Sequence, residues 1–267
     1  IDAAAELLRK QGIAKADKKS SRVAAEGVLA LAKSADGRRG AIVEVNCETD
    51  FVAREADFRS FSDAVAQVAL GGAASVEALL AAKLPSGESV DERRRALIAK
   101  IGENINVRRF VIVDAPTALG AYLHGTRIGA LVAVEGGDAT LAHDLAMHVA
   151  AANPRYTSTA DVPADVLAKE RQIETEKAMA EGKPPEIVAK MIEGRLRKAF
   201  NEVSLLGQPF VKDPDQTVEK LLKTAKAQVR SFQRLEVGEG IEKKQDDFVG
   251  EVMAQVKASA GAPPAAH

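Results

Sequence analysis

The chain has 267 residues, of which 46% are hydrophobic, and a formal net charge of −1. This balanced charge gives no overall attraction to nucleic acid or anionic lipid, and no apolar run approaches the roughly 18 residues that a membrane span requires. The single cysteine, Cys47, excludes an internal disulfide and is typical of a reducing, cytoplasmic environment.

The chain begins in a helical pattern. An apolar stripe predicts a helix over Asp2–Gln11, with Gly12 as its left-handed end. Because the pattern is helical from the first residue, we expect a preceding segment to be missing from this sequence. A basic linker follows, which is either solvated or in contact with a partner. Its charged residues include Lys15, Lys18, Lys19 and Arg22.

The next part of the chain predicts a hairpin, helices and a returning strand. Alternating apolar residues over Gly27–Ser34 and Gly40–Asn46 indicate two paired strands around a short turn. Ser89 and Glu92 form a capping box before a helix, and the strand Val107–Asp114 closes this half. An earlier helix is predicted to pack on the hairpin through Phe58, Phe61, Val65 and Val68.

The order of elements then repeats. A second hairpin is predicted at Gly120–Glu135, and its GALVAVE (Gly129–Glu135) echoes GAIVEVN (Gly40–Asn46). A helix follows from about Thr140. Near the far end, VRSF (Val229–Phe232) echoes the VRRF of the earlier closing strand. We therefore expect an α+β fold of two related subdomains, each with a small antiparallel sheet packed by helices.

An insertion at about 161–206 interrupts the second half. It predicts two helices joined by a turn at Gly182–Pro185, with an apolar stripe on the second helix. A two-helix hairpin is not expected to bury such a stripe by itself. We expect it to pack against a second copy of the chain in a dimer, or to fold back on its own body. The stripe consists of Val188, Ile192 and Leu196.

The last predicted element is an amphipathic helix after the GEG of Gly238–Gly240. It either docks on a partner or packs as an ordinary terminal helix, and residues 258–267 are predicted to be disordered. Its apolar face carries Phe248, Val249, Val252, Met253 and Val256.

Motifs for bond-making chemistry are weak. Gly238–Gly240 lacks the lysine spacing and the strand-turn-helix context of a phosphate loop. His143 and His148 do not share a helix stripe, and no second cysteine supports a metal site. Cys47 fits a small buried strand-end residue better than a nucleophile. The sequence therefore predicts no enzyme activity, no metal and no cofactor.

EVNCETDFVAR at Glu44–Arg54 resembles the signature segment of the elongation factor Ts family, the guanine-nucleotide exchange factors for elongation factor Tu. The family normally begins with a small three-helix domain, and Asp2–Gln11 resembles its last helix. Further segments resemble the family in order along nearly the whole chain. They are Lys100–Arg109, His124–Gly129, Met147–His148, Gly207–Val211 and Glu236–Lys243.

The resemblance implies a core of two subdomains, a dimerisation insertion and a C-terminal module that reaches the partner. The implied boundaries are 1–22 for the N-terminal remnant and linker, 23–116 for subdomain N, 117–160 and 207–242 for the two parts of subdomain C, 161–206 for the helical-hairpin insertion, and 243–267 for the C-terminal module and tail.

The resemblance also implies an exchange site around Asp50 and Phe51. Phe51 would wedge into the nucleotide-binding domain of elongation factor Tu, and Asp50 would perturb its magnesium and phosphate site. Thr49 and Val52 flank this pair. Without the resemblance, Phe51 reads as a hydrophobic staple on its own helix, and Asp50 as a first-turn acid favoured by the helix dipole.

Weaker contacts are implied elsewhere, and each has an ordinary alternative. Ile101 and Gly102 resemble contacts, but alone they read as a core residue and a helix end. His124 resembles a contact and reads as a turn residue. Val211 resembles a contact with another domain of the partner and reads as core. Lys19 resembles a contact with an acidic surface and reads as solvated.

Three classes of function follow. The first is exchange on elongation factor Tu, bound with GDP or without nucleotide, with a homodimer through 161–206 and no direct contact with nucleic acid or membrane. The second is a dimeric helical scaffold or chaperone-like binding protein without exchange activity. The third is a small-molecule enzyme that uses Cys47 or the pair His143 and His148.

Overall fold

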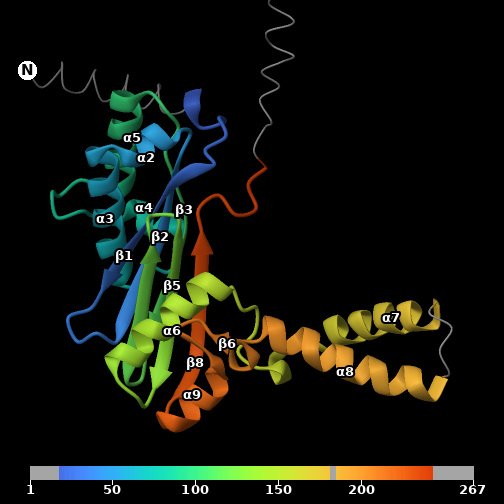
Figure 1. Cartoon of the computed structure of the whole chain (residues 1–267). Helices are drawn as coiled ribbons and strands as arrows, with labels where there is room; N and C mark the ends of the chain where they lie inside the picture. The colour runs from blue at the N-terminus through green and yellow to red at the C-terminus, as the bar shows by residue number, and fades with distance from the viewer. Residues whose placement is uncertain (1–17, 181–184, 243–267) are drawn as a thin grey trace, which may run out of the picture.

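The computed structural model describes residues 18–180 and 185–242. An elongated body of two sheets and their helices carries a helical hairpin that projects from its side (Figure 1). Several predicted features lie outside the described residues. They are the helix Asp2–Gln11, Lys15, the turn beginning at Gly182, the C-terminal helix and the tail.

The first subdomain is a three-stranded antiparallel sheet in the order β1-β2-β3. The predicted helix packs on this sheet because Phe58, Phe61 and Val65 share one buried face. The predicted capping box is also present: the Ser89 N–H donates to the Glu92 carboxylate (2.6 Å), and the Glu92 N–H donates to the Ser89 hydroxyl (3.1 Å). The elements are β1 (Glu26–Lys33), β2 (Arg39–Cys47), α2 (Asp50–Arg54), α3 (Ala56–Leu70), α4 (Val76–Ala81), α5 (Val90–Ile101) and β3 (Asn106–Asp114).

The second subdomain repeats this plan with a sheet in the order β4-β5-β8. Gly120 allows α6 to lie close on β4, since a Cβ there would stand 1.9 Å from the carbonyl oxygen of Ala142. The short β6–β7 pair was not predicted. The elements are β4 (Ala118–His124), β5 (Ile128–Glu135), α6 (Ala139–Ala152), η1 (Thr159–Asp161), α7 (Ala164–Ala180), α8 (Pro185–Val203), η2 (Leu205–Gly207), β6 (Pro209–Phe210), β7 (Asp213–Thr217), α9 (Val218–Thr224) and β8 (Gln228–Glu236).

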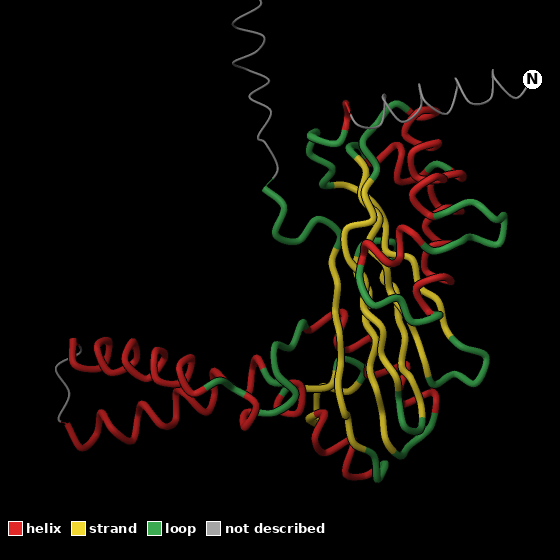
Figure 2. Tube along the Cα trace, turned by 180° about the vertical axis from the view of Figure 1, so that it is seen from behind, coloured by secondary structure: helices red, strands yellow, loops and turns green. Residues whose placement is uncertain are grey.

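The two sheets pack against each other, and the strands run together through the body (Figure 2). Alternate residues of a strand face opposite sides, so each sheet has a helix-facing and a sheet-facing surface. Leu29 and Ile42 of the first sheet meet Leu131 of the second in a shared buried layer. The opposite surface of β5, with Ala130 and Val132, packs on α6. The layers therefore run helices, sheet, sheet, helices.

Both halves also share an irregularity at the same place. The pairing of β2 with β3 shifts register between Glu44 and Val45, and that of β5 with β8 shifts between Ala133 and Val134. Aligning GAIVEVN with GALVAVE places these two shifts at one position. The predicted relation between the subdomains therefore extends to the position of a β-bulge.

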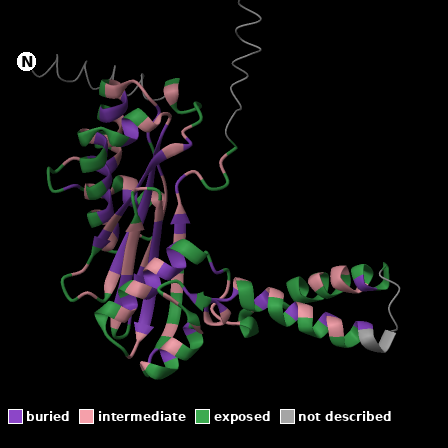
Figure 3. Ribbon diagram, viewed as in Figure 1, coloured by how far each residue is buried: buried purple, intermediate pink, exposed green. Residues whose placement is uncertain are grey.

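The insertion forms the predicted helical hairpin, but one expectation about it was wrong. Its stripe is buried within the hairpin itself: Val188, Ile192 and Leu196 are only 6%, 6% and 3% exposed. Figure 3 shows buried positions recurring along α8. Ala178 on α7 is buried in the same cluster as the stripe, so α7 covers it. The stripe is therefore covered without a second copy of the chain.

Candidate functional site

The strand-to-helix corner after β2, residues 48–51 (the corner), presents an aromatic ring to solvent. Phe51 is 75% exposed. The staple alternative is therefore wrong, because the ring does not pack on its own helix. Thr49 begins α2 as its N-cap, with its hydroxyl accepting from the Val52 N–H (3.4 Å). At Glu55 the chain becomes extended (ψ 137°), which ends α2 before α3 starts.

Helical geometry explains why the ring points outward. Successive residues are about 100° apart around a helix. When Val52 and Ala53 both face the core, the residue before them, Phe51, faces solvent. Val52 and Ala53 are 7% and 8% exposed and belong to the first core. Val52 therefore lies on the inner face of α2, which corrects its expected place among surface contacts.

Asp50 is accessible to solvent and forms an exposed ion pair with Arg54. Its Oδ2 lies 2.7 Å from Nη2 of Arg54 in an i,i+4 ion pair, with 50% of the aspartate side chain and 70% of the arginine side chain exposed. Exposed pairs of this kind contribute little to stability. Asp50 also stands in the first helical turn, as the dipole argument predicts. Its carboxylate is therefore available at the surface beside Phe51.

A loop between α5 and β3, residues 102–105 (the facing loop), holds the corner. One oxygen of the Glu103 carboxylate accepts from the N–H groups of Glu48 (3.0 Å) and Thr49 (3.1 Å), and the other accepts from the Thr49 hydroxyl (2.6 Å). A bond in the opposite direction joins the Asn104 N–H to Glu48 Oε1 (2.6 Å). We call Glu48, Thr49, Glu103 and Asn104 the clamp.

The segment before β1 is tied to the same loop. Nζ of Lys19 donates to the carbonyl oxygen of Gly102, and Asn104 Nδ2 donates to the carbonyl oxygen of Arg22 (2.7 Å). Arg22 in turn pairs with the Glu48 carboxylate (2.6 Å). Lys19 is thus partly buried and hydrogen-bonded, so the solvated alternative is wrong for this residue.

The expected residues at the end of α5 lie beside the corner. Ile101 is partly buried and packs against the first core. Gly102 ends the helix in a left-handed conformation (φ +90°), and its N–H donates to the carbonyl oxygen of Ile98 (2.9 Å). Ile101 is therefore a core-packing residue and Gly102 a helix end, as their ordinary alternatives predicted. They nevertheless lie next to the corner, because Glu103, which directly follows Gly102, accepts hydrogen bonds from Glu48 and Thr49.

The turn between β4 and β5 reaches the same end of the molecule. His124 is exposed, with Nδ1 3.4 Å from the Tyr122 hydroxyl. Arg127, at the other end of the turn, pairs with Glu26 (2.6 Å). Glu26 is the cross-strand partner of Cys47, which directly precedes the corner. His124 therefore belongs to the surface around the corner.

Val211 belongs to a separate surface, in the turn between β6 and β7. It is 44% exposed, so the core alternative is wrong; its neighbour Phe210 is the buried residue. Its N–H donates to Nδ1 of His148 (3.2 Å), and Nε2 of that buried histidine lies 3.0 Å from Gln208 Oε1. The expected residues thus lie on two surfaces: one around the corner, to which the second subdomain contributes His124, and one at the β6–β7 turn.

The residues considered for catalysis do not assemble into a reactive group. Cys47 is the fully buried last residue of β2. Burial, together with the charges of Glu103 and Glu26, raises the pKa of the Cys47 thiol to about 12, which disfavours the reactive thiolate near neutral pH. His143 is exposed and His148 is buried. Within the described residues, no group of three or more potential ligands is arranged to hold a metal ion.

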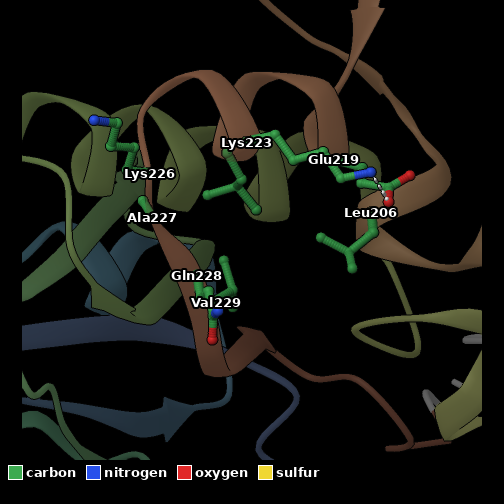
Figure 4. Close-up of a pocket in the computed structure, with 8 residues that line it drawn as sticks. Leu206, Glu219, Lys223, Lys226, Ala227, Gln228 and Val229 are labelled. Carbon is green, nitrogen blue, oxygen red and sulfur yellow. Dashed lines mark hydrogen bonds and ion pairs between the residues drawn. The ribbon is translucent and has the colours of Figure 1, made fainter.

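A cavity of about 590 Å³ lies between α9 and the start of β8 (Figure 4). Its walls are the apolar Leu206 and Val229 with charged residues at the rim, where Lys223 pairs with Glu219 (2.7 Å). The helix α9, which lines this cavity, lies at the opposite end of the body from α2 (Figure 1). None of the described helices is long and apolar enough to cross a membrane.

Sequence reasoning missed the residues that hold the corner. Glu48, Glu103 and Asn104 stand inside segments that carry the family resemblance, but no role was assigned to them. About 55 positions separate the two sides of the clamp. No local pattern indicates that a carboxylate so distant in sequence accepts hydrogen bonds from the start of α2.

Comparisons with known proteins place the chain in one family. A family model described as "Elongation factor TS" matches residues 48–239. The "Elongation factor Ts" of Methylococcus capsulatus is 58% identical over 261 residues, which cover 97% of this chain and 89% of that protein. Proteins with the same name from Hydrogenovibrio crunogenus and Alkalilimnicola ehrlichii are 53% and 54% identical, over 98% and 97% of this chain and 89% of each relative.

Proposed function

This chain belongs to the elongation factor Ts family, and on that premise we propose that it binds elongation factor Tu and promotes the release of GDP. An exchange factor breaks no bond. It binds the nucleotide-free partner more tightly than the nucleotide-bound partner. Linkage then requires that nucleotide bind the complex more weakly by the same factor.

The exposed ring of Phe51 carries this proposal. A side chain that is 75% exposed in the free chain gains binding energy only where a partner covers it. Burying a Phe side chain contributes about 1.5–3 kcal/mol. That energy becomes available only if the nucleotide-binding domain of the partner opens a gap for the ring. Phe51 therefore favours a distorted partner that holds nucleotide less tightly.

Asp50 acts beside the ring in this proposal. Magnesium requires near-ideal octahedral geometry, and in G proteins it bridges the phosphate oxygens of the nucleotide. A carboxylate introduced near that site perturbs the arrangement and accepts hydrogen bonds from displaced backbone. The ion pair with Arg54 is exposed, so releasing Asp50 toward the partner costs little.

Other contacts extend the interface. Gly102, His124 and Lys19 lie on the surface around the corner and are proposed to meet the nucleotide-binding domain, with Ile101 supporting them from its partly buried position. Val211, on the second surface, is proposed to meet a different domain of the partner. The separation of these two surfaces supports an interface that spans both subdomains.

The test is the rate of release of labelled GDP from elongation factor Tu, with and without this chain. We expect Phe51→Ala to lower the acceleration about ten- to hundredfold, because the binding energy of the ring is lost. The unfolding midpoint is expected to remain the same, since truncating an exposed side chain alters stability by about 0.5 kcal/mol or less.

Lys223→Ala is the control. The Lys223 side chain is 73% exposed, but it lies on α9, at the opposite end of the body from α2 (Figure 1), so this variant is expected to exchange as the parent chain does. If the parent chain does not accelerate release, the proposed function is wrong. If it does and Phe51→Ala is equally active, the wedge is wrong.

Self-association and location are further parts of the proposal. We propose that the chain acts in the cytoplasm, without bond chemistry, and dimerises through the hairpin. The hairpin projects from the body (Figures 1 and 2) and exposes Met179, Val166 and Leu167 at 68%, 37% and 38%. Sedimentation of chains with and without the hairpin measures the association.

A further inference from the structure

We propose that Glu103 is a positioning residue that holds the corner so that Phe51 meets the partner in one orientation. This inference rests on the proposed exchange function and adds to it a residue that touches neither Phe51 nor Asp50 by any hydrogen bond. Its effect passes through the backbone and hydroxyl of Thr49.

The carboxylate of Glu103 satisfies both sides of the strand-to-helix junction. Oε2 accepts the N–H groups of Glu48 and Thr49 at 3.0 and 3.1 Å, which fixes the chain as it leaves β2. Oε1 accepts the Thr49 hydroxyl at 2.6 Å. Hydrogen bonds to an ionised acceptor are shorter and roughly twice as strong as neutral ones. One side chain therefore fixes three donors on two successive residues.

Thr49 transmits this constraint to the ring. While its hydroxyl donates to Glu103, the same oxygen accepts from the Val52 N–H (3.4 Å) as the N-cap of α2. The cap sets the direction in which the first turn begins. Because α2 contains only Asp50–Arg54, few other helical hydrogen bonds fix that direction. The orientation of Phe51 thus depends on the geometry of Thr49.

The rest of the clamp keeps the corner folded when Glu103 is altered. The Asn104 N–H still donates to Glu48 (2.6 Å), and Arg22 still pairs with that carboxylate (2.6 Å). Val52 and Ala53 remain anchored in the first core. Loss of the Glu103 carboxylate is therefore expected to loosen the start of α2 without unfolding the subdomain.

Orientation matters because an interface residue that must be ordered on binding loses part of its binding energy. A site also needs its supporting groups to hold it close to the productive geometry. The Phe51 ring, which must enter a narrow gap in the partner, is especially sensitive to such errors in orientation. The clamp provides that support in the free chain, before any partner is present.

Two substitutions test the role of Glu103. Glu103→Ala removes all three acceptor contacts, and we expect the maximal rate of GDP release from elongation factor Tu to fall about 10- to 100-fold. The half-saturating concentration should change much less, because Val211 and His124 still contact the partner. Glu103→Gln keeps an amide oxygen for the two N–H groups and an NH₂ group for the Thr49 oxygen. It should stay within about fivefold of the parent rate.

A double substitution identifies the route of the effect. If Glu103 acts through the ring, Glu103→Ala should cause almost no further loss in a Phe51→Ala chain. Three outcomes overturn the inference: full activity of Glu103→Ala, equal loss in Glu103→Gln and Glu103→Ala, or independent losses in the double variant. The second would indicate that the charge itself meets the partner.

Thr49 provides a second test if Glu103→Ala does not fold. Thr49→Ser keeps the hydroxyl and should exchange as the parent does, whereas Thr49→Val removes it and should reproduce the loss in maximal rate. Equal activity of these two variants refutes the inference. Failure of the parent chain itself to accelerate GDP release refutes the proposed function instead, so the two failures are distinguishable.

Discussion

His148 shows how burial decides what a single titratable residue does. It is 1% exposed and lies between two neutral partners: Nε2 stands 3.0 Å from Gln208 Oε1, and Nδ1 accepts the Val211 N–H at 3.2 Å. Burial lowers the pKa of His148, and the hydrogen bond to Gln208 offsets this only in part. The imidazole is thus held neutral, with its proton on Nε2.

This arrangement predicts a loss of stability in mild acid. The folded-state pKa lies below the ordinary value of 6.5, so the unfolded chain binds more protons as the pH falls. The contribution of His148 is therefore fully present above pH 6.5 and is lost as the pH falls through the folded-state pKa. Urea unfolding between about pH 7.5 and pH 5 should show a steeper decline for the parent chain than for His148→Gln.

His143→Gln is the control for this pH dependence. His143 is on the same helix but exposed, so its replacement should leave the decline unchanged. Equal declines in the parent chain and His148→Gln would show that the neutral imidazole makes no such contribution.

At the scale of elements, the hairpin is a unit with its own small core. That core consists of Ala178, the stripe on α8 and Phe200, and it is separate from the cores of the two sheets. The base of the hairpin is fixed by backbone hydrogen bonds outside the helices, from the Leu205 N–H to the Tyr156 carbonyl oxygen (2.8 Å) and from the Leu206 N–H to the Thr157 carbonyl oxygen (3.0 Å). The hairpin is therefore expected to be separable from the body.

Replacing residues 165–202 with a short Gly-Ser linker tests this separation. We expect the unfolding midpoint of the body to change by only a few degrees, since neither sheet loses core contacts. If the hairpin dimerises the chain, the mass measured by sedimentation should fall from two chains to one. A parent chain that sediments as a monomer at all concentrations contradicts the dimer, and a large loss of body stability contradicts the separable hairpin.

At the scale of the whole molecule, Glu44 joins the two subdomains. This carboxylate is fully buried in β2 and pairs with Arg109 (2.5 Å) and Arg108 (3.1 Å). It also accepts the N–H of Gly238 (2.8 Å), just after β8. Arg109 reaches the carbonyl oxygen of Glu236 (2.9 Å). The GEG segment that follows β8 therefore contacts the first sheet rather than forming a phosphate loop.

The electrostatics of Glu44 favour its ionised form despite burial. Burial by itself raises the pKa of this carboxyl, but hydrogen bonds from Gly238, Arg109 and Asn46 outweigh that effect, so the pKa lies below its ordinary value. The stability that this provides is present above the ordinary carboxyl range and is lost as the pH falls through the folded-state pKa.

Glu44→Ala is predicted to destabilise the whole body. The substitution removes the buried acceptor of Arg108, Arg109 and the Gly238 N–H. Because the two arginine side chains are 24% and 31% exposed and Arg109 also pairs with Glu239 (3.4 Å), we expect a cost of about 1.5–3 kcal/mol. Denaturant unfolding measures this cost. The control Glu219→Ala breaks an exposed pair with Lys223 and should change stability by about 0.5 kcal/mol or less. Equal effects of the two substitutions would show that Glu44 does not join the subdomains.

The local elements and their order could be predicted from the sequence. The alternation in β1 and β2, the capping box at Ser89 and the echo between the two hairpins are properties of neighbouring residues, so they are visible before folding. The corner that carries Asp50 and Phe51 could be located in the same way, because both residues lie together in one segment that resembles the family.

Which surfaces those elements bury or expose became known from the folded chain. Phe51 is exposed because its neighbours are buried, and the α8 stripe is covered because α7 packs against it. Glu103 holds a corner about 55 residues earlier in the chain, and Glu44 reaches Gly238 across both subdomains. Periodicity encodes the preferences of a segment for a helix or a strand. It does not encode which distant segment supplies a hydrogen-bond partner, because packing brings the two together.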